Sequence, residues 1–97
     1  MTATRTAVLH LRGDVDFFTE DGFRAEAEQL LAEEGLTAFV VDLAEVDVID
    51  SSGLGLLIDL LRLCRELGIE MTLRGVSDRA QQLIDITGLH EVLRAAD

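Results

Sequence analysis

The sequence has no lysine, no proline, no tryptophan and no tyrosine, and it holds a single cysteine, Cys64. Without lysine there can be no P-loop lysine, no Schiff-base lysine and no receiver-type phosphoaspartate site that depends on one. A lone cysteine excludes an internal disulfide and favours a reducing compartment. The sequence therefore predicts a cytoplasmic protein.

Metal-binding and membrane-spanning patterns are also missing. The two histidines, His10 and His90, stand far apart, and no His/Cys cluster has the spacing of a metal site. The longest apolar run is too short to span a bilayer, and the first five residues lack the apolar core of a signal peptide. We expect no metal, no cofactor and no direct membrane insertion.

Acidic residues dominate the charge. The 97 residues include 19 Asp and Glu against 8 basic residues, which gives a net charge of −11. This balance disfavours nucleic acid and anionic membranes as partners and favours a basic protein surface. The length suits a single domain covering residues 1–97, large enough to form a modest core.

Hydrophobic periodicity predicts strands that alternate with helices. Strands are expected at 7–12, 38–43, 69–74 and 91–93, and helices at 17–34, 54–67 and from a Ser77 cap to 87. Two strands alternate apolar with polar side chains, so helices should cover chiefly one face of the sheet. The predicted class is α/β, with a mainly parallel or mixed sheet.

The helix expected at 54–67 carries two neighbouring apolar stripes. One contains Leu54, Leu57, Ile58, Leu61 and Cys64, and the other Leu56, Leu60, Leu63 and Leu67. Together they cover more of the helix than one sheet contact requires. Two interpretations stay open: the second stripe packs against neighbouring helices, or part of it, such as Leu56, is exposed for a partner.

The most informative segment is Asp50-Ser51-Ser52-Gly53-Leu54-Gly55, which precedes the leucine-rich run. A serine hydroxyl can accept hydrogen bonds from the free N–H groups of a first helical turn. The positive end of a helix also suits a phosphate. A serine here is therefore a candidate for a helix cap, for a modification site, or for both.

Three segments together resemble a known family. The run from Val40 to Gly55 looks like the central signature of STAS domains, and more specifically of the anti-sigma factor antagonists of bacterial partner-switching systems. Leu11–Asp16 matches the family's earlier Gly-x-x-Asp element, and Thr87-Gly88-Leu89 matches its late turn. The resemblance covers nearly the whole chain and implies a STAS-like single domain.

The resemblance also implies a function. Ser51, the first serine after the aspartate, corresponds to the residue that an anti-sigma factor serine kinase phosphorylates. The unmodified antagonist binds this kinase, phosphorylation breaks the complex, and a serine phosphatase resets it. Asp16 matches the family aspartate near the phosphorylation loop. ATP belongs to the partner, so no nucleotide site is implied here.

We expect the partner to dock on one patch formed by the Asp14–Asp16 turn, the Asp50–Gly53 loop and Leu56. Loops after parallel strands gather at the same edge of a sheet, which brings these segments together. For Ser52, helix capping is the preferred interpretation. For Asp14 and Asp16, an ordinary solvated turn is as good an explanation as a functional role.

Other functions stay open. The chain could be a STAS subunit of a lipid or anion transport complex, or a scaffold component of a stress-signalling assembly. An enzyme is disfavoured, because a serine nucleophile needs a base and no histidine stands at a suitable spacing.

Overall fold

The computed structural model describes residues 4–86, which form three strands and three helices in strict alternation. The elements are β1 (Thr6–Val15), α1 (Glu20–Leu31), β2 (Ala38–Ile49), α2 (Ser51–Leu67), β3 (Glu70–Arg74) and α3 (Asp78–Ile86). The predicted α/β alternation is confirmed. The strand predicted at 91–93 and the Thr87–Leu89 turn lie outside the described residues.

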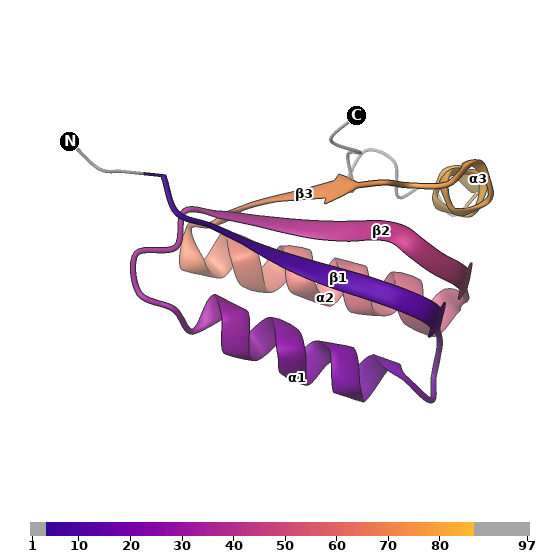
Figure 1. Cartoon of the computed structure of the whole chain (residues 1–97), viewed down its shortest axis with the longest axis horizontal. Helices are drawn as coiled ribbons and strands as arrows, with labels where there is room; N and C mark the ends of the chain where they lie inside the picture. The colour runs from indigo at the N-terminus through magenta and orange to yellow at the C-terminus, as the bar shows by residue number, and fades with distance from the viewer. Residues whose placement is uncertain (1–3, 87–97) are drawn as a thin grey trace.

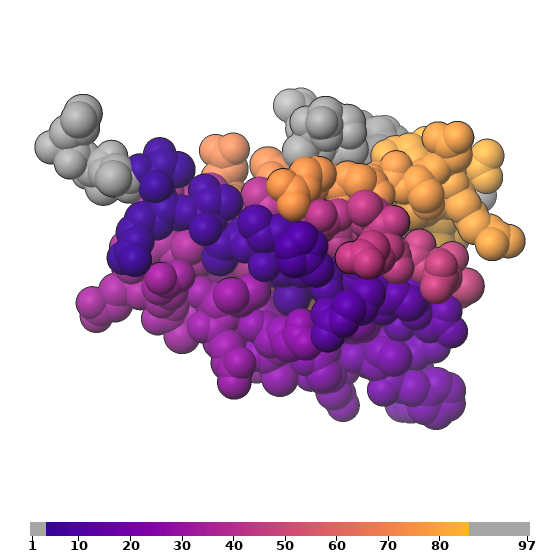
Figure 2. All heavy atoms as spheres, viewed as in Figure 1, coloured from indigo at the N-terminus to yellow at the C-terminus, as the bar shows by residue number. Residues whose placement is uncertain are grey.

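The three described strands form one parallel sheet in the order β1-β2-β3. Helices α1 and α2 lie side by side against one face of this sheet, and α3 lies past the end of β3 (Figure 1). The space-filling view keeps this order, with α1 at the bottom and α3 at the upper right (Figure 2). The prediction that helices cover chiefly one face is confirmed.

The core lies between the sheet and the α1–α2 layer. Alternate residues of each strand point into it, as a period of two requires. Its largest fully buried side chains are Leu9, Leu11, Phe39, Leu43, Leu56, Leu57, Leu60, Leu73 and Ile84. Both leucine stripes of α2 thus contribute to the core, because the helix packs against α1 as well as against the sheet.

The opposite sheet face carries a row of charged side chains. His10, Asp42 and Arg74 occupy matching positions on β1, β2 and β3. An Asp42 carboxylate oxygen lies 3.3 Å from His10 Nδ1 and 3.0 Å from Arg74 Nη2. The Ala44 N–H, and then the Arg74 guanidinium, lower the pKa of Asp42 by hydrogen bonding to its charged form. This row confirms the polar side of the predicted strands.

Several boundaries differ from the sequence prediction. Strands β1 and β2 continue to Val15 and Ile49, past the predicted ends at 12 and 43. Register irregularities after His10 and after Gly13, where φ is +68°, let the two strands stay paired through residues that resemble a turn in the sequence. Helix α1 covers less than the predicted 17–34, while α2 begins at Ser51 instead of Leu54.

Candidate functional site

The candidate site lies where β1 and β2 end, on the same side of the sheet (Figure 1). Val15 pairs with Ile49 in the parallel register, and the Asp50 N–H donates to the Val15 carbonyl at 3.2 Å. The loop after β1 and the loop after β2 are therefore neighbours. The structure brings together the Asp14–Asp16 turn and the Asp50–Gly53 loop, as the parallel topology requires.

Asp50, not a serine, caps helix α2. Its Oδ1 accepts from the Ser52 N–H at 2.8 Å and from the Gly53 N–H at 3.1 Å, and its backbone is extended. The prediction that Ser52 is the cap is wrong. A cap at Ser52 would require the helix to begin at Gly53, but it begins two residues earlier, at Ser51. A carboxylate cap is also stabilised by the positive end of the helix.

Because Asp50 caps the helix, neither the Ser51 hydroxyl nor the Ser52 hydroxyl is needed as a cap. Ser51 is the first helical residue and is exposed, while Ser52 is half-buried. Within residues 4–86 neither hydroxyl makes a hydrogen bond; the contact of Ser52 with the Asp50 carboxylate is through its backbone N–H. A reaction at the Ser51 hydroxyl would therefore break no hydrogen bond of the described fold.

Gly53 and Leu56 belong to the interior and not to an outer surface. A Cβ at position 53 would lie 2.5 Å from the Val15 carbonyl oxygen and 2.6 Å from Ile49 Cγ1, so only glycine allows α2 to approach β1 this closely. Leu56 is fully buried. The interpretation of Leu56 as an exposed partner contact is wrong, because this side chain is fully buried in the hydrophobic core.

The turn after β1 is held by its own side chains. Asp16 Oδ1 accepts from the Phe18 N–H at 2.9 Å and the Thr19 N–H at 3.1 Å. Thr19 Oγ1 donates to the Asp14 carbonyl at 2.8 Å and accepts from the Asp16 N–H at 3.0 Å. Asp16 thus has a structural role in an Asx-type turn, whereas the Asp14 side chain is exposed.

The sequence prediction missed two exposed aromatic side chains in this turn. Phe17 and Phe18 are 68% and 89% exposed, and their rings meet edge to face with centroids 5.7 Å apart. Both residues precede α1 and do not belong to it, because the Asp16 carboxylate accepts the Phe18 N–H and holds these residues in a turn before the first helical residue, Glu20. The signal that could have revealed them is Asp16 followed three residues later by Thr19.

Acidic residues dominate the two segments that form the site. Asp14, Asp16, Glu45, Asp47 and Asp50 all lie in the two segments that meet there, and neither 13–23 nor 43–61 contains an arginine or a histidine. All the arginines in residues 4–86 therefore come from other segments of the chain. The surface is suited to a partner that supplies basic residues.

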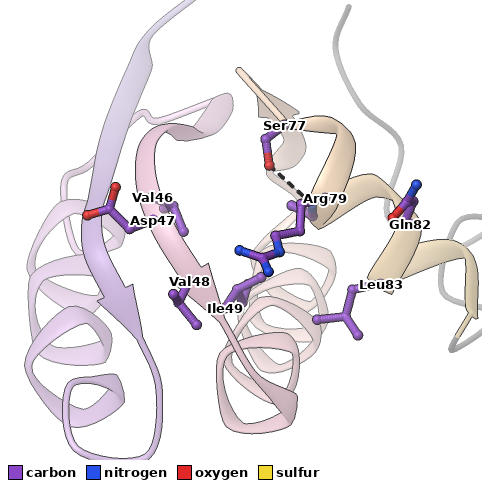
Figure 3. Close-up of a pocket in the computed structure, with 9 residues that line it drawn as sticks. Val46, Asp47, Val48, Ile49, Ser77, Arg79, Gln82 and Leu83 are labelled. Carbon is purple, nitrogen blue, oxygen red and sulfur yellow. Dashed lines mark hydrogen bonds between the residues drawn. The ribbon is translucent and has the colours of Figure 1, made fainter.

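A separate hollow of about 380 Å³ lies between the end of β2 and α3. Arg79 and Leu83 of α3 reach toward Ile49 across it, while Asp47 points away (Figure 3). None of the predicted site residues lines it. In the described part of the chain no group of three potential metal ligands gathers, and no helix is long and apolar enough to cross a membrane.

Comparison with known proteins identifies the family. The family model of the STAS domain matches residues 2–97. The chain belongs to the STAS-domain family. Among curated relatives, the anti-sigma-B factor antagonist of Listeria monocytogenes is 32% identical over 88% of this chain and 74% of its own length.

Solved structures confirm the STAS fold. The anti-sigma factor antagonist SpoIIAA in its unphosphorylated form aligns with a TM-score of 0.78, 22% identity, and coverage of 100% of this chain and 84% of that one. A sulfate transporter family protein from Wolinella succinogenes aligns with the same TM-score, 26% identity, and coverage of 91% and 70%. In this STAS domain, Asp50–Gly55 forms the junction of β2 and α2.

Proposed function

We propose that this STAS domain is an anti-sigma factor antagonist whose binding to its partner is controlled at Ser51. In its unmodified form it binds an anti-sigma factor that is also a serine kinase. Phosphorylation of Ser51 ends the complex, and a serine phosphatase restores the binding form. The names of the curated relatives support this role, and the role requires a cytoplasmic location.

The observation that supports the proposal most strongly is that Asp50 caps helix α2 while the neighbouring Ser51 hydroxyl stays exposed. Asp50 already satisfies the Ser52 and Gly53 N–H groups, so the exposed Ser51 hydroxyl has no structural duty in the described fold. The helix cap, Asp50, and the proposed modification site, Ser51, are then two neighbouring residues and not one residue with both roles. A kinase can take the Ser51 hydroxyl as its substrate without dismantling the start of α2.

A phosphate at Ser51 should disturb docking far more than folding. It adds about 1.5 to 2 negative charges, at a helix N-terminus where an anion is favoured. The surrounding surface already carries Asp14, Asp16 and Asp50. A partner that approaches this crowded anionic surface must desolvate the phosphate, so affinity falls while the helix stays intact.

We propose a docking surface made of Asp14, Asp16, Asp50, Ser51 and Ser52. Its carboxylates would face arginine or lysine residues on the anti-sigma factor and would speed the encounter. Catalysis and ATP belong to the partner, and this chain acts as substrate and ligand rather than as an enzyme.

The second candidate function is that of a STAS subunit of an anion transport complex. The structural similarity of this chain to the Wolinella sulfate transporter family protein favours this candidate. Purification of the tagged chain from its native cells separates the two. A stable complex with an integral membrane transporter supports the second candidate, whereas a complex with a small serine kinase supports the first.

The direct test is phosphorylation with purified anti-sigma factor kinases of the same genome and ATP, followed by mass-spectrometric mapping. We expect one phosphate on Ser51, none on Ser51→Ala, and full modification of the matched control Ser52→Ala. Ser51→Asp should keep a cooperative thermal transition and bind the kinase more weakly. Modification confined to Ser52, or none by any of these kinases, contradicts the proposal.

A further inference from the structure

Phe17 and Phe18 form the most exposed aromatic surface in the described part of the chain. The other two phenylalanines, Phe23 and Phe39, are buried, as expected for this residue type. Among residues 4–85, the other exposed large hydrophobic residues are Val48 and Leu67, at 48% and 51%, which is less than either phenylalanine. Two adjacent phenylalanines exposed to water contribute little to the stability of this fold, so their exposure calls for another explanation.

The exposure is built into the turn. The Asp16 carboxylate accepts from the N–H groups of Phe18 and Thr19, and the Thr19 hydroxyl binds the Asp14 carbonyl. These contacts hold the backbone of the pair between β1 and α1. The rings contact each other edge to face, a favoured aromatic geometry. The turn therefore presents a defined aromatic surface outward.

The pair adjoins the docking surface along the chain. Asp16 of that surface directly precedes Phe17, and Asp50 donates its N–H to the Val15 carbonyl of the same segment. Val48, 48% exposed, pairs with Asp14 across the strands. In these two segments, which contain no cation, apolar groups thus stand among carboxylates; Arg79 of α3 lines the hollow beside Val48. This pattern complements a partner pocket that is apolar inside and basic at its rim.

We infer that Phe17 and Phe18 are the hydrophobic anchor with which this chain binds its anti-sigma factor. The inference rests on the proposed function, and it adds the residues that supply affinity. Buried aromatic side chains dominate the binding energy of many protein interfaces, while exposed rim charges contribute mostly to the rate of encounter. In this division, Ser51 controls whether the complex forms and the aromatic pair determines how tightly it holds.

The test compares Phe17→Ala and Phe18→Ala with the matched control Leu67→Ala. Leu67 is also about half exposed, but it ends α2, whereas Ser51 begins that helix. Isothermal titration calorimetry with the anti-sigma factor kinases of the same genome gives the dissociation constants. We expect each phenylalanine variant to bind at least about tenfold more weakly than wild type. Leu67→Ala should bind within about twofold, and all three should keep the wild-type melting temperature.

Kinase kinetics give a second readout. Loss of a docking anchor should raise the KM for this chain as substrate while kcat at saturation stays unchanged. If both phenylalanine variants bind with wild-type affinity, the inference that Phe17 and Phe18 are the anchor is wrong, but the proposed function is unaffected. Failure of the wild-type chain to bind any of these kinases overturns both. A dimer in sedimentation velocity that the variants dissociate would assign the pair to a second copy of this chain, which also overturns the inference.

Discussion

The alkaline stability of this protein should depend on one thiol. Cys64 lies fully buried on α2, and burial raises the pKa of its thiol from 9.0 to about 11. The chain has no lysine and no tyrosine, and arginine keeps its proton far above this range. The α-amino group titrates near pH 8. Between pH 9 and 11, Cys64 is therefore the single side chain whose charge changes.

The sign follows from the proton balance. Above pH 9 the unfolded chain loses the Cys64 proton, while the folded chain holds it until about pH 11. The folded state binds more protons in this window, so stability falls as pH rises. A difference of two pKa units corresponds to roughly 2 to 3 kcal/mol. For a domain of this length, such a loss lowers the melting temperature on the order of 10 °C.

The assay is urea unfolding at 25 °C, followed by far-UV circular dichroism because tryptophan and tyrosine are absent. Samples at pH 8, 9, 10 and 11 contain a reductant at constant ionic strength. Cys64→Ala is the control: it should be less stable at pH 8, because it leaves a small cavity, but flat from pH 9 to 11. The reasoning is refuted if wild type is equally flat, or if the variant loses as much stability as wild type.

Two further predictions concern the start of α2. Gly53→Ala should destabilise the fold by about 1 to 3 kcal/mol, because its Cβ meets the Val15 carbonyl. Gly55→Ala, with open space around its Cβ, should instead stabilise it by up to about 1 kcal/mol; equal thermal shifts in both variants would contradict this. Asp50→Ala should cost about 1 kcal/mol through the lost cap, whereas Asp50→Asn should lose only a few tenths. Urea titration checks this pair, and an Asn variant as unstable as the Ala variant would sink the capping argument.

Much of the fold could be predicted because hydrophobic period and helix stops are local signals. The alternation in 7–12 and 69–74 showed which strand face is polar, and Gly68 closes α2 in the left-handed conformation that glycine favours. Strand ends were harder. Residues near Gly13 and Glu45 look like turns in the sequence, but pairing between β1 and β2 keeps them extended. Such pairing joins distant segments, so a local pattern does not contain it.

The sequence predicted where the candidate site lies, but not which residue caps the helix, which is buried and which is exposed. The Asp50–Gly55 segment pointed to a helix start, yet the cap passed from serine to Asp50 because α2 begins at Ser51. The burial of Leu56 depends on how α2 packs into the whole core, which the pattern of one helix does not reveal. Phe17 and Phe18 fit the helical pattern of the residues that follow them. The hydrogen bonds of Asp16 hold them in a turn before the helix instead.

The Val15 carbonyl has a kinetic consequence. It accepts the Asp50 N–H at 3.2 Å and lies directly against Gly53, so it fixes the two loops at the ends of β1 and β2 to each other. Loops that are already ordered lose little conformational entropy when they meet a partner. Association at this edge should then be limited by diffusion and by the relative orientation of the two proteins, with no slow rearrangement of this chain.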